Sequence, residues 1–272
     1  MPTDFIMSTS TDKLRISCLQ FNLQWENPEA NLAIVDAMID TGPETDLWLL
    51  PELFTTGFSI VKKQLAESMN GASVNWMLAK ALQTNSHISG SLLINEEGKV
   101  SNRLLWASPQ GKLGMYDKRH LFRMAGEHAH LVGGNTKLVA SCKGWNIMPL
   151  ICYDLRFPVW ARNSYKQGKF TYDILTYHAN WPEARSYAWR QLLIARAIEN
   201  QAYVIGINRC GTDGNGIAHS GDTMVIDYKG QILAQLPANT QGILEVELSL
   251  SQLQHYRESF AAMLDWDSFE LL

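Results

Sequence analysis

Three short apolar runs end abruptly in reactive side chains, and this feature most constrains how the 272-residue chain can fold. One run ends at Glu52, the second at Cys152, and the third at His178 and Asn180. An apolar run of this length, bounded by turn residues, is typical of a buried strand. Functional sites in α/β proteins gather at the carboxyl ends of strands, so the pattern points to one site built from several strand ends.

Helical segments separate the apolar runs. One begins at Pro28, and a longer one is predicted from Pro182 to about Asn200. Strands and helices therefore alternate, which indicates α/β layers, while hairpin signals at 95–101 and 228–232 argue against a purely parallel sheet. Because the chain contains no linker, repeat or low-complexity stretch, we expect a single domain with mixed sheets and helices outside.

The composition excludes several classes of protein. The formal net charge is −4 and the basic residues are scattered, so nucleic acid is not expected as a partner. No apolar run approaches the ~18 residues of a membrane span, and residues 1–12 lack the apolar stretch of a signal peptide. The four cysteines, Cys18, Cys142, Cys152 and Cys210, are widely spaced and show no paired metal-ligand spacing. We therefore expect a cytoplasmic protein with free thiols, no membrane partner and no metal site.

Cys152 lies at the centre of WNIMPLICYDLRFPVW, residues 145–160. Read alone, it is a small apolar residue of a core strand, which is the common fate of unpaired cysteines. A nucleophilic cysteine needs a base for its proton and donors for an oxyanion. Glu52 can act as the base, Lys118 can supply positive charge, and the backbone N–H of Tyr153 is a further donor if Cys152 occupies a sharp turn. Taken singly, the glutamate is consistent with a surface ion pair and the lysine with a solvated side chain.

Three multi-residue motifs occur in order around these positions: PELFTTGF at 51–58, YDKRHLF at 116–122 and ICYDLRFP at 151–158. With them the chain resembles the nitrilase, or carbon–nitrogen hydrolase, superfamily over roughly residues 13–250. The catalytic set of that superfamily is Glu, Lys and Cys in this order along the chain. The resemblance changes the interpretation of Cys152 from a packing residue to a nucleophile. It also implies an α/β fold of four layers, an αββα sandwich, which agrees with the mixed α/β prediction.

The resemblance implies a role for each matching residue. Cys152 would be the nucleophile, Glu52 the general base, and Lys118 the cation that stabilises the tetrahedral intermediate. Glu127 matches a second glutamate that orients the lysine and the attacking groups. The thiol would attack an amide carbonyl, ammonia would leave, and water would hydrolyse the thioester, with no metal or organic cofactor.

The resemblance also implies how the chain is divided and assembled. The hydrolase domain would span 13–250, with an N-terminal extension at 1–12 and a C-terminal tail at 251–272. Members of the superfamily usually form homodimers, often through helices and C-terminal tails. The aromatic-rich segment 255–269 is a candidate for that interface, and covering its own domain is the alternative.

The segments HLFRMAGEHAH (120–130) and YHANWPEARS (177–186) look like those of the bacterial omega-amidase group. Those enzymes remove the terminal amide of 2-oxoglutaramate and related 2-oxo acid amides. Such a substrate carries a carboxylate remote from the scissile amide, so the pocket needs a cation. Arg185 is one candidate for this role and Arg123 is another.

Further residues near the motifs are expected to complete the pocket and its support. The residues expected to line it are Phe58, Tyr153, Asn180 and Trp181. Arg156 is interpreted as structural, pairing with a carboxylate beneath the turn. His120 invites a papain-type Cys–His interpretation, but it falls inside the lysine motif, so we assign it a supporting role.

Other functions stay open from the sequence alone. The amide could belong to deaminated glutathione or to an N-carbamoyl compound, because the triad is common to these enzymes. A true nitrilase is disfavoured by the residues around Lys118 and Cys152. A non-catalytic binding protein on the same fold would be expected to lack a member of the triad. A redox-sensing role for Cys152 would leave Glu52 and Lys118 unexplained.

Overall fold

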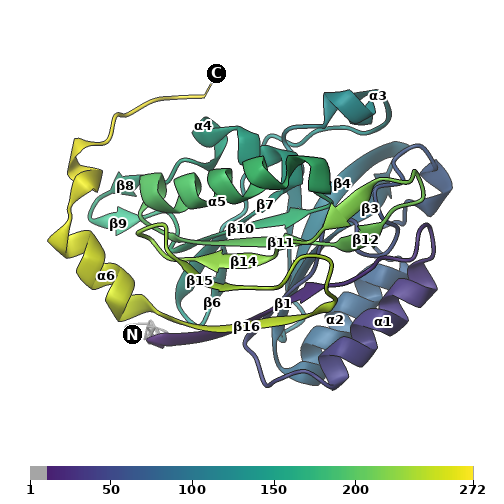
Figure 1. Cartoon of the computed structure of the whole chain (residues 1–272), viewed down its shortest axis with the longest axis horizontal. Coiled ribbons are helices and arrows are strands. Elements are labelled where there is room, and N and C mark those ends of the chain that lie inside the picture. The colour runs from purple at the N-terminus through teal and green to yellow at the C-terminus, as the bar shows by residue number, and fades with distance from the viewer. Residues whose placement is uncertain (1–10, 272) are drawn as a thin grey trace, which may run out of the picture.

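Two six-stranded sheets form the centre of the molecule, whose computed structural model describes residues 11–271 (Figure 1). In spatial order the first sheet contains β16 (Gly242–Ser249), β1 (Lys13–Gln20), β2 (Leu47–Leu49), β3 (His87–Glu96), β4 (Lys99–Ala107) and β5 (Leu113–Asp117). The second contains β15 (Ile232–Gln235), β14 (Met224–Ile226), β11 (Tyr203–Asn208), β10 (Ile174–Ala179), β7 (Trp145–Ile151) and β6 (Ala140–Cys142). In each sheet three neighbouring strands run parallel and the flanking strands pair antiparallel, so both sheets are mixed as predicted.

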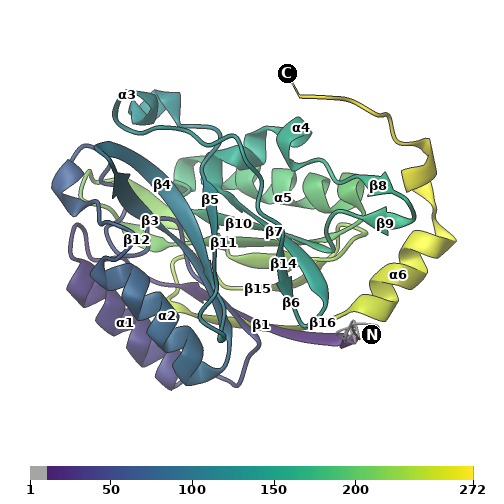
Figure 2. The same ribbon diagram turned by 180° about the vertical axis from the view of Figure 1, so that it is seen from behind.

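Helices cover the outer face of each sheet (Figures 1 and 2). The first sheet is covered by α1 (Pro28–Asp40) and α2 (Ala72–Thr84), and the second by α4 (Pro158–Ala161) and α5 (Ser186–Asn200). The order of layers is therefore helix, sheet, sheet, helix. The predicted four-layer αββα sandwich is confirmed.

Alternation along the strands fills the spaces between the layers. In β2, Leu47 and Leu49 pack between the sheets together with Ile205 of β11. Trp48, which lies between those two leucines, points to the opposite face and packs with Val35 of α1. Because both faces of the central strands are buried, they appear in the sequence as continuous apolar runs rather than as alternating patterns.

The long helix of the second sheet begins later than the sequence predicted. A 3₁₀ turn, η4 (Glu183–Arg185), follows Pro182, and α5 starts only at Ser186. Arg185 has φ −121° and ψ 17°, outside the helical region, and its carbonyl accepts a hydrogen bond from Trp181 Nε1 at 2.8 Å. This bond holds the chain in a turn, so the prediction of a helix from Pro182 was wrong by one turn.

Short elements complete the chain. They are η1 (Lys63–Leu65), η2 (Arg123–Ala125), α3 (Glu127–His130), η3 (Cys152–Arg156), β8 (Tyr165–Lys166), β9 (Lys169–Phe170), β12 (Cys210–Thr212), β13 (Ala218–Ser220), α6 (Leu250–Ser259) and η5 (Ala262–Asp265). Most of the predicted N-terminal extension, residues 1–12, lies outside the described part of the chain. None of the helices within residues 11–271 is long and apolar enough to cross a membrane.

The C-terminal segment packs partly on its own domain, next to the start of β1 (Figure 1). Arg257 of α6 is buried and forms an ion pair with Asp173 at 2.8 Å. Trp266 packs edge-to-face against Phe170 with a centroid separation of 5.9 Å. Phe260, in contrast, is 58% exposed. One part of the tail therefore covers its own domain and another part presents apolar surface.

The carboxyl ends of β2, β7 and β10 meet, as the three apolar runs predicted. Strands β7 and β10 are parallel neighbours, with Ile151 opposite His178. His178 Nδ1 lies 2.6 Å from the carbonyl oxygen of Leu50, just after β2, and so joins the two sheets at this end. Burial lowers the pKa of His178 to about 4, which keeps the ring neutral between the sheets. The residues that follow these strand ends share one region.

Candidate active site

Four of the predicted residues converge where the strand ends meet. Glu52 follows β2, Lys118 follows β5, Glu127 begins α3, and Cys152 begins η3. Lys118 Nζ lies 2.8 Å from Glu52 Oε1 and 2.9 Å from Glu127 Oε2. The two glutamates and the lysine have no exposed surface, and Cys152 is 8% exposed. Chain segments that are far apart in the sequence thus contribute three charged side chains to one buried site.

Electrostatics decide the protonation state of the lysine. Burial alone would lower the pKa of Lys118, but the charges of Glu127 and Glu52 outweigh it and raise the pKa above its ordinary value. The ammonium is therefore retained at neutral pH. Removing one partner from such a buried pair typically costs about 3–5 kcal/mol, because it leaves an uncompensated charge.

Donors from β4 and from the residue just after β10 hold Glu52 in place. Asn102 Nδ2, on β4, donates to Glu52 Oε1 at 2.8 Å, and the backbone N–H of Asn180 donates to Oε2 at 2.9 Å. The Asn180 side chain also donates to the carbonyl oxygen of Glu52. Asn180 was predicted as a substrate-binding residue; in the structure its backbone N–H and its side chain both bond to Glu52. Sequence reasoning missed Asn102, because a single amide in β4 carries no periodic or motif signal.

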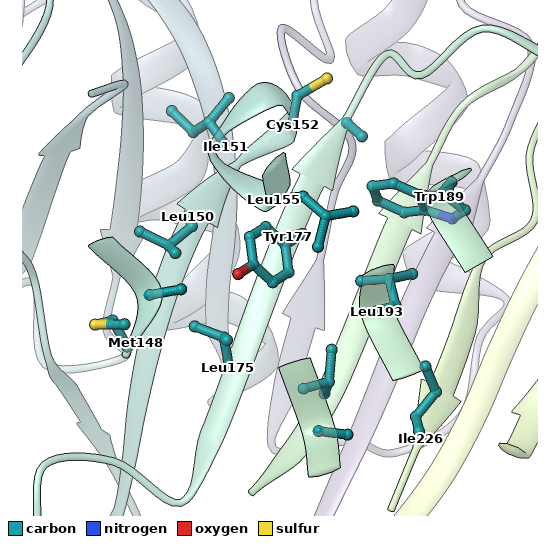
Figure 3. Packing of buried hydrophobic residues seen from close by; sticks show 14 of the residues in the cluster. Met148, Leu150, Ile151, Cys152, Leu155, Leu175, Tyr177, Trp189, Leu193 and Ile226 are labelled. Carbon is teal, nitrogen blue, oxygen red and sulfur yellow. The ribbon is translucent and has the colours of Figure 1, made fainter. Parts of the chain in front are cut away.

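Cys152 occupies the strained turn that follows β7. Its φ is +42°, a conformation that a residue with a side chain rarely adopts. The sulfur points away from the packed side chains of Leu150, Leu155 and Tyr177 (Figure 3). The sharp strand-to-turn geometry anticipated for a nucleophile elbow is therefore present.

Asp154 holds this turn from below. Its Oδ2 accepts from the backbone N–H of Ile151 at 3.1 Å and from the Tyr116 hydroxyl at 2.7 Å. Its Oδ1 accepts from the backbone N–H of His120 at 3.0 Å and lies 2.8 Å from the ring Nδ1. The buried carboxylate thus ties the cysteine turn to the segment that follows Lys118. This agrees with the supporting role predicted for His120.

The predicted role of Arg156 was wrong. Among the described residues Arg156 forms no ion pair, and its guanidinium lies over the Trp181 ring, 4.9 Å from the centroid. Asp154 does the anchoring instead, because its short side chain reaches back to the N–H groups of its own turn. Arg156 is therefore left facing the pocket.

The thiol needs a base. Burial, together with the negative charge of Glu52, raises the pKa of Cys152 well above that of a free thiol, although the Lys118 charge acts in the opposite direction. The residue is accordingly a thiol at neutral pH. Burial also raises the pKa of Glu127, and the Lys118 charge partly offsets this effect. A side-chain hydrogen bond links the Cys152 thiol to Glu52.

A cavity of about 70 Å³ opens onto the cysteine. Its lining residues are Phe58, Lys118, Phe122, Ala125, Cys152, Tyr153, Arg156, Asn180, Trp181, Pro182, Arg185, Asp213, Ile217 and His219. All five predicted substrate-binding residues belong to this set, and Arg123, the alternative cation, does not. Asp213 and His219 come from the β12–β13 hairpin, which was not among the segments predicted to form the pocket.

Two observations concern other possible sites. A larger groove of about 730 Å³, lined by His87, Trp106 and Cys142 among others, contains none of the four converging residues. Within residues 11–271 no group of three or more His, Cys, Asp or Glu side chains is arranged to hold a metal ion. The small cavity is lined by Cys152 and Lys118, and the ammonium of Lys118 is bound by Glu52 and Glu127.

Comparison with known proteins agrees with this geometry. The family model described as carbon–nitrogen hydrolase matches residues 15–258, nearly the whole chain. The chain belongs to the carbon–nitrogen hydrolase family. Its relatives include omega-amidase YafV of Escherichia coli, 46% identical over 95% of this chain and 98% of that protein. Another is 2-oxoglutaramate amidase of Bacillus subtilis, 33% identical over 93% of this chain and 97% of that protein.

Solved structures show the same fold for this carbon–nitrogen hydrolase. A CN-hydrolase superfamily protein from Xanthomonas campestris, with an arsenic adduct in its active site, superposes with a TM-score of 0.94 at 42% identity. The match covers 96% of this chain and all of that chain. Nit3 of Saccharomyces cerevisiae, at 24% identity, shares the fold with a TM-score of 0.80 over 92% of this chain and 95% of its own.

Proposed function

We propose that this carbon–nitrogen hydrolase removes the terminal amide of 2-oxo acid amides such as 2-oxoglutaramate, giving the dicarboxylate and ammonia. The observation that carries the proposal is the buried Lys118 between Glu52 and Glu127, beside the strained turn of Cys152. The small cavity at that turn is also lined by the guanidinium-bearing residues Arg156 and Arg185. The relatives named omega-amidase and 2-oxoglutaramate amidase support this choice of substrate class.

In the first half-reaction the Cys152 thiol gives its proton to Glu52, and the sulfur attacks the amide carbonyl carbon. The Lys118 ammonium and the backbone N–H of Tyr153 stabilise the resulting oxyanion. The tetrahedral intermediate then collapses and the C–N bond breaks. The proton held by Glu52 passes to the leaving nitrogen, so ammonia departs and a thioester on Cys152 remains.

In the second half-reaction Glu52 takes a proton from water, whose oxygen attacks the thioester carbonyl. The same donors stabilise the second oxyanion, the C–S bond breaks, and the proton returns to the sulfur. Glu127 holds the ammonium in position throughout, at 2.9 and 3.1 Å from its two carboxylate oxygens. Water and the amide are the only reactants, and no net proton is left on the protein.

The distal carboxylate of the substrate would be bound by arginine. Arg185 lies over the Phe122 ring at 5.3 Å and Arg156 over the Trp181 ring at 4.9 Å, and neither forms an ion pair within the described chain. A guanidinium binds a carboxylate through two parallel hydrogen bonds. The small volume of the cavity favours a short linear amide over deaminated glutathione, which is the alternative substrate in the same superfamily.

The first prediction concerns the nucleophile. Cys152→Ala should reduce ammonia release from 2-oxoglutaramate by about four orders of magnitude or more, because no thioester can form. An enzyme-coupled ammonia assay measures the rate, and circular dichroism checks that the fold persists. Cys210→Ala, at another buried free cysteine, is the matched control and should keep the wild-type rate. Turnover by the Cys152 variant near the wild-type rate would remove the proposal.

The second prediction concerns the distal carboxylate. Arg185→Ala should lower kcat/KM for 2-oxoglutaramate about 10- to 100-fold, the effect expected for losing a charge-assisted hydrogen-bonded pair. For butyramide, which has no distal carboxylate, the change should be within about twofold. Equal losses on the two amides would move the carboxylate site away from Arg185, and Arg156→Ala is the companion variant.

We also propose that the protein is a cytoplasmic homodimer, with the hydrolase domain at 13–250 and the tail at 251–272 contributing to the interface. Its four cysteines are unpaired, which suits a reducing compartment. Ile198 on the outer side of α5 is 50% exposed, and nearby Phe260 is 58% exposed. The two segments are joined by a hydrogen bond from Gln201 Nε2 to the carbonyl of Phe260 at 2.7 Å.

The third prediction tests this assembly. Sedimentation equilibrium should give a mass of two 30.6 kDa chains for the wild type. Ile198→Glu should give a single chain, because a charge buried in an interface without a partner is strongly unfavourable. Leu82→Glu, on the exposed side of α2, is the control and should stay dimeric. A wild-type mass of one chain would refute the homodimer.

A further inference from the structure

We propose that Asn102 is the positioning residue that fixes the distance between the two glutamates and the lysine. Its side-chain amide bridges Glu52 and Glu127, and its backbone carbonyl holds the segment that carries Lys118. The inference rests on the proposed function for the roles of these three residues. Asn102 is uncharged and does not contact the substrate in this proposal. It sets the positions of the two glutamates and the lysine and their affinity for protons.

The contacts of Asn102 reach three of the four converging residues. Its Nδ2 lies 2.8 Å from Glu52 Oε1 and 3.4 Å from Glu127 Oε1. Its backbone oxygen accepts a hydrogen bond from the backbone N–H of Lys118 at 3.0 Å. The side chain has no exposed surface. Asn102 pairs with Leu93 of β3, and on its other side the backbone bond to Lys118 lies just past the end of β5, so the position of this residue is fixed by the sheet.

The side-chain amide of Asn102 is oriented by its contacts with the two carboxylates. Asn102 Oδ1 is buried and has no hydrogen-bond partner among the described residues. The amide group therefore turns both of its N–H bonds toward carboxylates while its own oxygen stays unsatisfied, which is normally unfavourable. Turning the group over would place Oδ1 against two carboxylate oxygens. The negative charges of Glu52 and Glu127 thus hold the amide in the observed orientation.

A neutral donor serves a proton-transferring carboxylate better than a second cation would. Each time Glu52 accepts a proton, its attraction to Lys118 weakens, because one charge of the ion pair is lost. An amide N–H donates strongly to a charged carboxylate and, more weakly, to a neutral carboxyl oxygen. Asn102 can therefore keep Glu52 in place in both states, and errors of about 1 Å in such positions have large effects on rate.

The fourth prediction uses two substitutions at this position. Asn102→Leu removes both donors at similar size, and Asn102→Asp keeps the shape but replaces the donor with a carboxylate. Each should lower kcat by about tenfold or more while KM changes by less than about threefold. Both should also move the acid limb of kcat/KM to higher pH, and the aspartate variant should move it further. Loss of a donor to the carboxylates, or addition of a like charge beside them, favours protonation of the cluster, so the active form is lost at a higher pH.

A shift of the pH profile can be attributed to the cluster around Asn102, because the titratable groups that face it are few. The titratable groups facing Glu52 and Asn102 are Lys118, Glu127 and Cys152, with His219 acting from β13. Alkylation of Cys152 by iodoacetamide provides a second profile that needs no knowledge of the natural substrate. Its pH dependence should shift in the same order: wild type, then the leucine variant, then the aspartate variant.

The matched control is Asn163→Leu. Asn163 is also buried and donates to two backbone carbonyls, at 3.0 and 3.2 Å, but belongs to a loop remote from the four converging residues. The Asn163→Leu variant should unfold at a lower urea concentration than the wild type, while both of its pH profiles stay at the wild-type position.

If Asn102→Leu does not fold, Asn102→Asp carries the same test. Unshifted profiles or a kcat within about twofold of wild type would overturn the inference. Absence of 2-oxoglutaramate turnover by the wild type would instead refute the proposed substrate.

Discussion

The structure depends on one buried cation. Lys118 lies between Glu52 and Glu127 with no exposed surface, and its removal would leave two buried carboxylates without their cation. The ammonium keeps its proton because two negative charges outweigh the effect of burial on its pKa. In the proposed mechanism this positive charge lies where negative charge develops on the amide oxygen.

The αββα sandwich brings residues from distant parts of the chain next to this cation. Strand pairing places Ile151 beside His178, and His178 then contacts the carbonyl of Leu50 in the other sheet. Asp154 links the turn of Cys152 to the segment after Lys118. These links are between backbone groups or short, buried side chains, so they leave little freedom to the reacting atoms. The strained φ of Cys152 is tolerated because the surrounding contacts determine it.

Much of the fold and the four converging residues could be predicted from the sequence, and the reasons are physical. Strands buried on both faces appear in the sequence as apolar runs, and these runs end at the site. Glu52, Lys118 and Cys152 each lie within a short motif of consecutive residues, which can be recognised without the fold. The contribution of Asn102 could not be predicted, because an isolated amide on a strand has no periodic or local signal. The role of Arg156 was misjudged because the choice between an ion pair and a cation–π contact depends on tertiary placement. The later start of α5 depended on a single indole hydrogen bond.

The most direct test of the account is a rapid-quench measurement of the thioester in Glu52→Gln. The variant keeps the size of the side chain but cannot accept the thiol proton. Mixed with 2-oxoglutaramate and quenched in acid, it should show no acyl group on Cys152 by mass spectrometry and should release no ammonia. The wild type should show a transient acyl group under the same conditions. Acylation of the variant at the wild-type rate would contradict the account, because another group would then be the base for the thiol.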